Sequence, residues 1–348
     1  MIKRVKFICI IFFCIQARIS YAETSWSNSD IDAMISGIKY RVGIKSENFM
    51  KNKIFLPKTP QRPVIIKKGV IDHDLCETTP FVFKDKVYRL EWFRRGRILR
   101  IMDHDSGKEI SRFGTKHRFP CAYVEGDTVY VVGTKETARW CGNILTMFTS
   151  KDLTKWREHT IFSIDGNNIC NTSLCKTDNR YIMSIELTKP RGFPARFIES
   201  KDLANWTLLS AEHKHALGRY NAPHCLRWHK GWFYLFYLEA HKPHGYEQYI
   251  TRSRDLITWE TSPLNPVLAA SSKDKKIANP RLTPEQRERI IKAVNVNNSD
   301  IDFCEFKGHL IINYSWGNQN GTEFIAEAEF AGTTGQFLEG WFYQVPKK

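Results

Sequence analysis

The chain has 348 residues, of which 42% are hydrophobic and 26% charged, an ordinary composition for a soluble globular protein with a large core. Its formal net charge of +15 indicates either an anionic environment or binding partner, or a basic surface that serves only solubility. Because no basic run and no RNA motif accompanies this charge, we exclude nucleic acid as a partner.

Residues 1–22 have the pattern of a secretory signal. A basic start at residues 3–6 precedes an apolar run at 7–15, and Ser20-Tyr21-Ala22 is a small-residue cleavage site. The alternative is a membrane anchor, but the apolar run is short for a bilayer. We therefore predict a secreted or periplasmic protein with no stable membrane anchor.

The cysteines do not form a recognisable framework. Nine are present, two of them in the predicted signal, so an odd number remains in the mature chain. Several fall at equivalent points of predicted strands, where cysteine acts as a small buried hydrophobic residue. No Cys-x-x-Cys pair occurs, which excludes the usual structural zinc site. We predict no metal and no cofactor.

After a lead-in at residues 23–65, with a short helix expected at 29–40, a motif of the form Ser-x-Asp-Leu-x-x-Trp occurs three times. The copies begin at Ser150, Ser200 and Ser253. A repeat of about 50 residues with several strand-like segments per unit is typical of a β-propeller. We expect the Ser and Asp to tie a turn and the Trp to pack between neighbouring blades.

Aromatic hairpins mark the blades. Their first strands open with a polar residue, each four residues before a Phe or Cys, and these openings are Glu77, His117, Asn171, Asn221 and Asp300. The sequence thus predicts an all-β fold, a five-bladed β-propeller of four-stranded blades over residues 66–345. An insertion at 263–295, with a capping box at 283–286, predicts a short helix before the last blade.

The five openings should form a ring at one end of the central channel. There Glu77 and Asp300 would be neighbours, because the first and last blades close the circle, and Asp302 would point the same way as Asp300. The alternative is that the ring only satisfies channel water and backbone groups. The loop ends add Glu91, Glu186 and Glu239, which are either site residues or members of structural ion pairs.

The hairpins and the outer motif together resemble the five-bladed propeller glycosidases, with glycoside hydrolase families 43 and 32 and their relatives as the nearest. The resemblance covers residues 66–345. It implies a propeller that acts on carbohydrate. The catalytic pattern of family 43 is not preserved, because its three acids correspond here to Thr79, Asn171 and Asn221. Asparagine cannot serve as a general acid, so the acids of the family are not transferred.

We therefore predict a secreted glycoside hydrolase that cleaves a glycosidic bond in an anionic or substituted polysaccharide or oligosaccharide. The expected catalytic carboxylates are Glu77 and Asp300. The expected substrate-binding residues come from the ring and the loop ends; they are His117, Asn171, Asn221, His224, Glu186, Arg191, Glu239, His244, Asp302 and Trp316. The alternative is a glycan-binding propeller without catalysis, which Asn171 and Asn221 favour.

Overall fold

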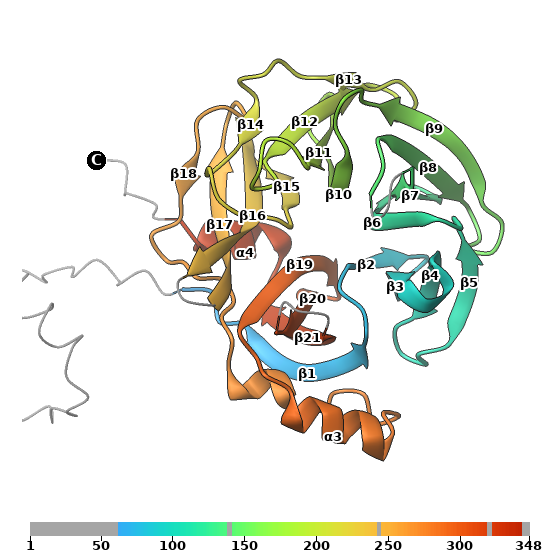
Figure 1. Cartoon of the computed structure of the whole chain (residues 1–348), viewed down its shortest axis with the longest axis vertical. Helices are drawn as coiled ribbons and strands as arrows, with labels where there is room; N and C mark the ends of the chain where they lie inside the picture. Colours follow the sequence, from blue (N-terminus) through green and yellow to red (C-terminus); the bar gives the residue numbers. More distant parts are fainter. Residues whose placement is uncertain (1–61, 138–140, 242–244, 319–321, 343–348) are drawn as a thin grey trace, which may run out of the picture. The chain divides into compact units, whose positions relative to one another are not determined.

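The computed structural model describes four stretches of the chain, namely residues 62–137, 141–241, 245–318 and 322–342. The predicted signal and the helix expected at 29–40 lie outside them. Within the described residues the chain is mostly β-strand, with few helices (Figure 1). None of the described helices is long and apolar enough to cross a membrane.

Two sheets have four strands each, taken in chain order. The first contains β2 (Thr78–Phe83), β3 (Lys86–Phe93), β4 (Ile98–Asp103) and β5 (Glu109–Phe113). The second contains β6 (His117–Glu125), β7 (Thr128–Lys135), β8 (Ile144–Ser150) and β9 (Arg157–Ser163). All their pairings are antiparallel, as the predicted hairpins require.

The third sheet has five strands, with β13 and β14 both pairing with β12. Its strands are β10 (Ile169–Lys176), β11 (Tyr181–Leu187), β12 (Ala195–Ser200), β13 (Thr207–Leu208) and β14 (Lys214–His215).

The fourth sheet has eight strands and consists of two antiparallel parts joined by one parallel bridge, between Tyr246 and Asn297. The first part contains β15 (Cys225–His229), β16 (Trp232–His241), β17 (Gly245–Ser253) and β18 (Glu260–Thr261). The second part contains β19 (Asn297–Phe306), β20 (His309–Gly317), β21 (Glu323–Ala331) and β1 (Ile66–His73). The first described strand thus pairs with the last one.

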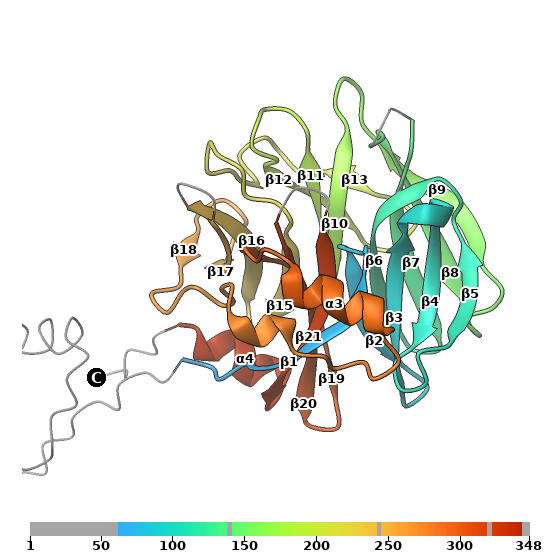
Figure 2. The same ribbon diagram turned by 60° about the horizontal axis from the view of Figure 1, so that its bottom comes forward.

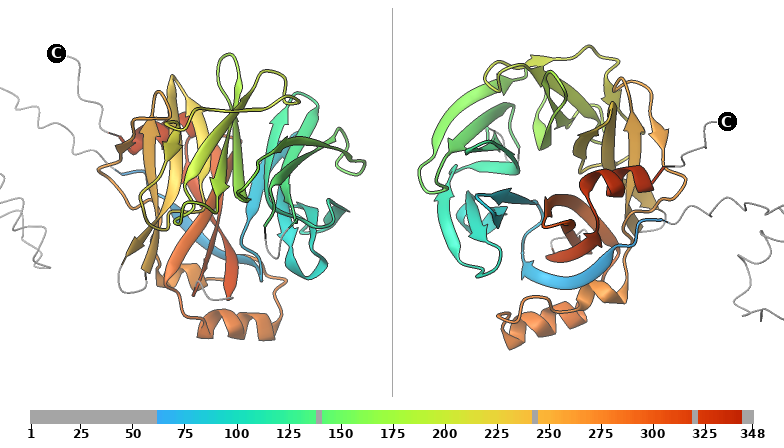
Figure 3. Two further views of the ribbon diagram at one scale, coloured as in Figure 1. Left: turned by 45° about the horizontal axis from the view of Figure 1, so that its top comes forward. Right: turned by 180° about the vertical axis from the view of Figure 1, so that it is seen from behind.

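The sheets stand around a common centre (Figures 1 and 3). The innermost strand of each group is its first hairpin strand, and the neighbours around the centre are β2, β6, β10, β15 and β19. These strands start at the same end, so their first residues gather there. Loops and strand ends held by such a rigid frame are where function is expected.

The repeated motif forms the predicted turn. In its first copy the Ser150 hydroxyl accepts a hydrogen bond from the Leu153 backbone N–H at 2.9 Å, and Asp152 caps the next two N–H groups at 2.8 Å. Trp156 stacks on Phe113 of the preceding sheet, with ring centroids 3.9 Å apart. The other two copies make the same turn contacts. The structural role predicted for the motif is confirmed.

The insertion lies against the outside of β1, as Figure 2 shows. Its helix α3 (Pro284–Lys292) begins with the predicted capping box, in which Thr283 and Gln286 bond each other's backbone. A short 3-10 helix, η3 (Ser272–Lys275), carries Asp274, which is buried and lies 2.6 Å from Lys67 of β1. The other helices among the described residues are η2 (Arg94–Gly96) and α4 (Thr334–Gly340).

Candidate active site

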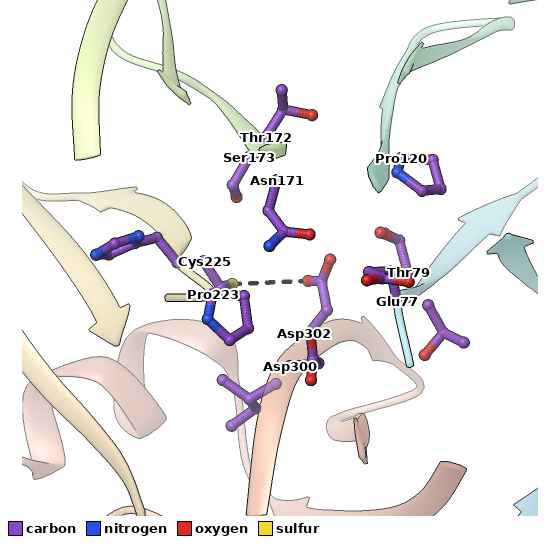
Figure 4. A pocket seen from close by; sticks show the side chains of 13 residues that line it. Glu77, Thr79, Pro120, Asn171, Thr172, Ser173, Pro223, Cys225, Asp300 and Asp302 are labelled. Carbon is purple, nitrogen blue, oxygen red and sulfur yellow. Dashed lines mark hydrogen bonds between the residues drawn. The ribbon is translucent and has the colours of Figure 1, made fainter. Parts of the chain in front are cut away.

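A cavity of about 250 Å³ lies where the inner strands begin. Its walls carry the carboxyl groups of Glu77, Glu186, Asp300 and Glu323, together with Arg94. Aromatic rings and small side chains complete the lining, which includes Phe119, Phe193, Tyr220, Cys170, Ala222 and Pro223. A smaller hollow of about 40 Å³ shares part of this wall and extends toward Asp302 and Cys225 (Figure 4).

Glu77 stands immediately before β2 and lines both spaces. Its Oε2 atom is buried and has no hydrogen-bond partner among the described residues. Burial raises the pKa of Glu77, and the charge of Asp300 raises it further, while Arg94 acts in the opposite direction. The carboxyl group of Glu77 therefore holds its proton more tightly than an exposed glutamate does.

Asp300 lies on β19 and shares both spaces with Glu77, as the predicted closure of the ring requires. Burial raises the pKa of Asp300, but hydrogen bonds from the hydroxyls of Ser299, at 2.6 Å, and Ser315, at 2.5 Å, favour its ionised form. The two carboxyl groups thus have different surroundings: Glu77 has one oxygen without a partner among the described residues, whereas Asp300 receives two hydroxyl donors.

β-Bulges in the inner strands aim side chains at the cavity. The ladder between β19 and β20 shifts register between Ser299 and Asp302, and Asp300 within this bulge has a left-handed φ of 53°. The inner strand β6 has a similar shift around Phe119, whose φ is 51°. Bulges redirect side chains in this way next to active sites. They bring Asp300 and Phe119 onto the same wall.

Glu186, on β11, is the third carboxyl group of the cavity and is only 1% exposed. It accepts hydrogen bonds from the Asn171 amide at 2.8 Å and from the His224 backbone N–H at 2.6 Å, and the His224 ring Nδ1 lies 3.0 Å away. Burial raises the pKa of Glu186 to about 8 and lowers that of His224 to about 3. Burial thus favours the uncharged forms of both Glu186 and His224.

Arg94, in η2, is a site residue that the sequence analysis missed. Its guanidinium group bonds the Cys76 sulfur, while its buried Nε has no hydrogen-bond partner among the described residues. It forms no ion pair closer than 4 Å with any described acid, yet its charge lowers the pKa of Glu77. Arg94 follows the second strand of its sheet, the same place as the loop-end residues of the other hairpins, and this position is the signal in the sequence that marks it as a candidate.

His117 lines neither space, so the structure does not place it in the expected ring, and its role in substrate binding stays a prediction. Its ring packs against β8 of its own sheet, with Nε2 2.9 Å from the Thr146 hydroxyl and the ring centroid 4.9 Å from that of Phe148 in a perpendicular arrangement. The bulge that follows it in β6 is the reason, because the extra residues place Phe119 at the cavity instead.

Three other residues that were expected to contact substrate are buried or paired within the protein. Asn221 is fully buried, and its backbone bonds Gly192 and Leu238. Trp316 is fully buried and stacks on Phe324 at 4.6 Å, because its strand β20 is covered on both faces. Glu239 is held by the guanidinium of Arg219 at 2.7 and 2.8 Å and is absent from the cavity lining.

The remaining residues predicted to bind substrate lie partly at the smaller hollow and partly away from it. Asn171 and His224 line the hollow beside the catalytic candidates, as expected for binding groups. Asp302 also lines it, but it is paired with Arg227 and lies 3.7 Å from the Cys225 sulfur (Figure 4). Arg191 is exposed and does not belong to the cavity lining. His244 lies outside the described residues.

Known proteins resemble this chain in fold. No protein-family model and no curated protein matches the sequence. A xylan beta-1,4-xylosidase from Bacillus halodurans superimposes with a TM-score of 0.53 at 14% identity, over 75% of this chain and 54% of that one. A GH43 endo-arabinanase from Bacillus licheniformis gives 0.50 at 11% identity, over 79% and 99%.

A third solved structure, the GH43 BlXynB protein from Bacillus licheniformis, gives a TM-score of 0.52 at 13% identity, over 76% of this chain and 54% of that one. The chain thus spans about half the length of two of these three proteins. The resemblance to propeller glycosidases of family 43 is confirmed at the level of the fold.

Proposed function

We propose that the protein is a secreted five-bladed β-propeller glycoside hydrolase that cleaves a glycosidic bond in an anionic or substituted polysaccharide or oligosaccharide. The blades would be β2–β5, β6–β9, β10–β14, β15–β18 and, as the last, β19–β21 completed by β1. The fold likeness to glycosidases supports this class. Fold alone does not fix an activity, so the proposal depends on the site.

The proposed hydrolase activity depends on one observation. Three buried carboxyl groups, of Glu77, Asp300 and Glu186, line one cavity, and none has a Lys or Arg within ion-pair distance among the described residues. A structural acid buried without a basic partner destabilises a protein. Glycoside hydrolysis, in contrast, needs carboxyl groups whose proton affinities differ within one site.

The surroundings of each acid suggest its role. Glu77, with a raised pKa and a free Oε2, would give its proton to the leaving oxygen of the glycosidic bond. Asp300, whose ionised form is favoured by two serine hydroxyls, would activate water or attack the sugar. Glu186, Asn171 and His224 would bind sugar hydroxyls as an uncharged hydrogen-bonding group.

The anionic character of the substrate is supported by the net charge of +15 and by Arg94 in the cavity. The cavity itself contains more acids than bases, so the negative groups of a polymer would lie mainly outside it. Binding of an acidic oligosaccharide should then weaken as salt rises, because exposed charges are screened over about 10 Å at 0.1 M ionic strength. Equal binding of neutral and acidic oligosaccharides at every salt concentration would contradict this part.

The experiment that tests catalysis begins with a screen of acidic and neutral polysaccharides. On the best substrate, Glu77→Gln and Asp300→Asn should each lower kcat by a factor of about 10²–10⁴, the usual contribution of a general acid or base. Their melting temperatures should stay close to that of the wild type, because both substitutions preserve shape. The control Glu260→Gln removes an exposed carboxylate of an outer strand and should leave kcat unchanged.

A non-catalytic glycan-binding propeller is the second candidate. It is favoured by the amide side chains of Asn171 and Asn221 at positions where the family has acids. A glycan that binds but is never cleaved, with affinity unaffected by Glu77→Gln, would replace the hydrolase by this candidate.

A further inference from the structure

Two cysteines, Cys141 and Cys170, flank an antiparallel bridge near the cavity. Gly142, in the connection between β7 and β8, forms an antiparallel bridge with Ile169 at the start of β10, and the Ile169 N–H donates to the Gly142 carbonyl at 2.7 Å. Continued by one residue, this antiparallel register would place Cys141 opposite Cys170. The Thr134 hydroxyl of β7 also donates to the Cys170 carbonyl, at 3.1 Å, so the two segments are packed together here.

The register matches the geometry of a disulfide. Facing residues in an antiparallel pair have Cα atoms about 4.5–5.5 Å apart. A disulfide requires Cα atoms about 4.4–6.8 Å apart. Both cysteines are buried, with 3% and 2% exposure. Cysteines in the described ladders face other residue types, with the pairs Cys121 and Val132, Cys175 and Ile182, Cys225 and Phe236, and Cys304 and Ile311.

We propose that Cys141 and Cys170, which are thiols in this structure, are joined by a disulfide in the exported protein. Exported proteins mature in oxidising compartments, where disulfides form and persist. The cross-link does not depend on the proposed hydrolase activity. It would tie the β7–β8 connection to the inner strand β10, directly before Asn171.

The reaction needs a disulfide donor, such as oxidised glutathione or an oxidoreductase in its disulfide form. One thiolate of the pair attacks the donor and releases one donor thiol, which leaves a mixed disulfide on the protein. The second thiolate attacks this mixed disulfide and releases the other donor thiol, so the cysteines are oxidised and the donor is reduced. Burial raises the pKa of both thiols, so the bond should form during folding, before the segments are buried.

The direct test is peptide mapping of the full chain, exported into a bacterial periplasm and alkylated under denaturing conditions without reductant. We expect the peptides that contain Cys141 and Cys170 to be linked, with the mass of the pair lacking two hydrogens. Cys76, Cys121, Cys175, Cys225 and Cys304 should be alkylated. Complete alkylation of Cys141 and Cys170 in the exported protein, or linkage of either to another cysteine, would overturn the proposal.

Thermal unfolding provides a second readout. Reductant should lower the melting temperature of the wild type by about 5–10 °C, as expected for loss of a disulfide in a domain of this size. Cys141→Ala and Cys170→Ala should melt near the reduced wild type and should not respond to reductant. The control Cys304→Ser should keep the full response, because its thiol faces Ile311. A wild type that does not respond to reductant would contradict the cross-link even if both alanine variants failed to fold.

Discussion

Two groups of buried acids in this protein differ in their partners. The first group lies at the seam where β1 meets the sheet β2–β5. Glu91 is fully buried there, 2.5 Å from the Arg89 Nε and 2.6 Å from the Arg100 Nε, and Asp72 of β1 lies 3.4 Å from Arg100. The second group is in the cavity, where Glu77, Asp300 and Glu186 have no such guanidinium partner.

The comparison separates acids that hold the fold from acids available for chemistry. At the seam, opposite charges compensate each other, so ionisation is compatible with burial. In the cavity, hydroxyls, amides and a histidine replace the arginines, and the pKa values rise. Neutralising a seam acid should therefore lower stability and spare the site, whereas neutralising a cavity acid should impair the site without that loss of stability.

The largest effect on stability is expected from Glu91→Gln. The substitution leaves the buried guanidinium groups of Arg89 and Arg100 without their central carboxylate, and breaking a buried pair in this way costs about 3–5 kcal/mol. Urea unfolding measures the loss. Folded protein should retain any glycan binding of the wild type. A loss below about 1 kcal/mol would show that the seam does not depend on this carboxylate.

Glu186→Gln tests the other group and should have a smaller effect of the opposite sign. The pKa of Glu186 rises from 4.5 to about 8 on folding, so the folded state binds more protons between these values and its stability falls as pH rises through them. The variant should therefore gain stability relative to the wild type, by a few kcal/mol at most, as pH rises from about 5 to about 9. A stability difference that is constant with pH would contradict the raised pKa.

Asp72→Asn should produce a weaker, acid-dependent effect. Burial alone would raise the pKa of Asp72, but hydrogen bonds from His73 and the charges of Arg89 and Arg100 together lower it below 3.8. The carboxylate thus contributes stability above about pH 4, and this contribution is lost as pH falls through the lowered value. Urea midpoints between about pH 3 and pH 7 should vary less in the variant than in the wild type.

The smallest effect is expected at an exposed pair. Asp127 and Lys151 lie 3.0 Å apart, with side chains 66% and 72% exposed. Solvent screens such pairs, so Asp127→Asn should leave the urea midpoint unchanged within error. A clear loss of stability would mean that the exposed fraction of an acidic side chain does not predict whether its ion pair stabilises this fold.

The sequence predicted features that depend on local chemistry. The Ser-x-Asp-Leu-x-x-Trp turns and the Thr283–Gln286 capping box are complete within a few residues, so their patterns could be read directly. The neighbourhood of Glu77 and Asp300 followed from the order of the hairpins. This prediction of their proximity required only that the first and last groups of strands lie side by side.

Other parts of the site depend on contacts between distant segments. A bulge beginning at Arg118 turns His117 away from the cavity and brings Phe119 to it, and no residue pattern announced this shift. Glu91 and Glu186 occupy similar strand ends, yet one has Arg100 as a partner and the other has Asn171. These partners come from other strands, so the sequence could not assign the two glutamates to different roles.

The pairing of β1 with β21 has a consequence for how the chain acquires its fold. During synthesis β1 emerges among the first described segments, while its partner emerges near the end. The nascent chain therefore holds an unpaired strand until almost all of its sequence is available. Contacts between such distant segments slow folding, because the loop must close before the contact stabilises it. Loss of the last strand would leave β1 as an open edge, prone to pair with other chains.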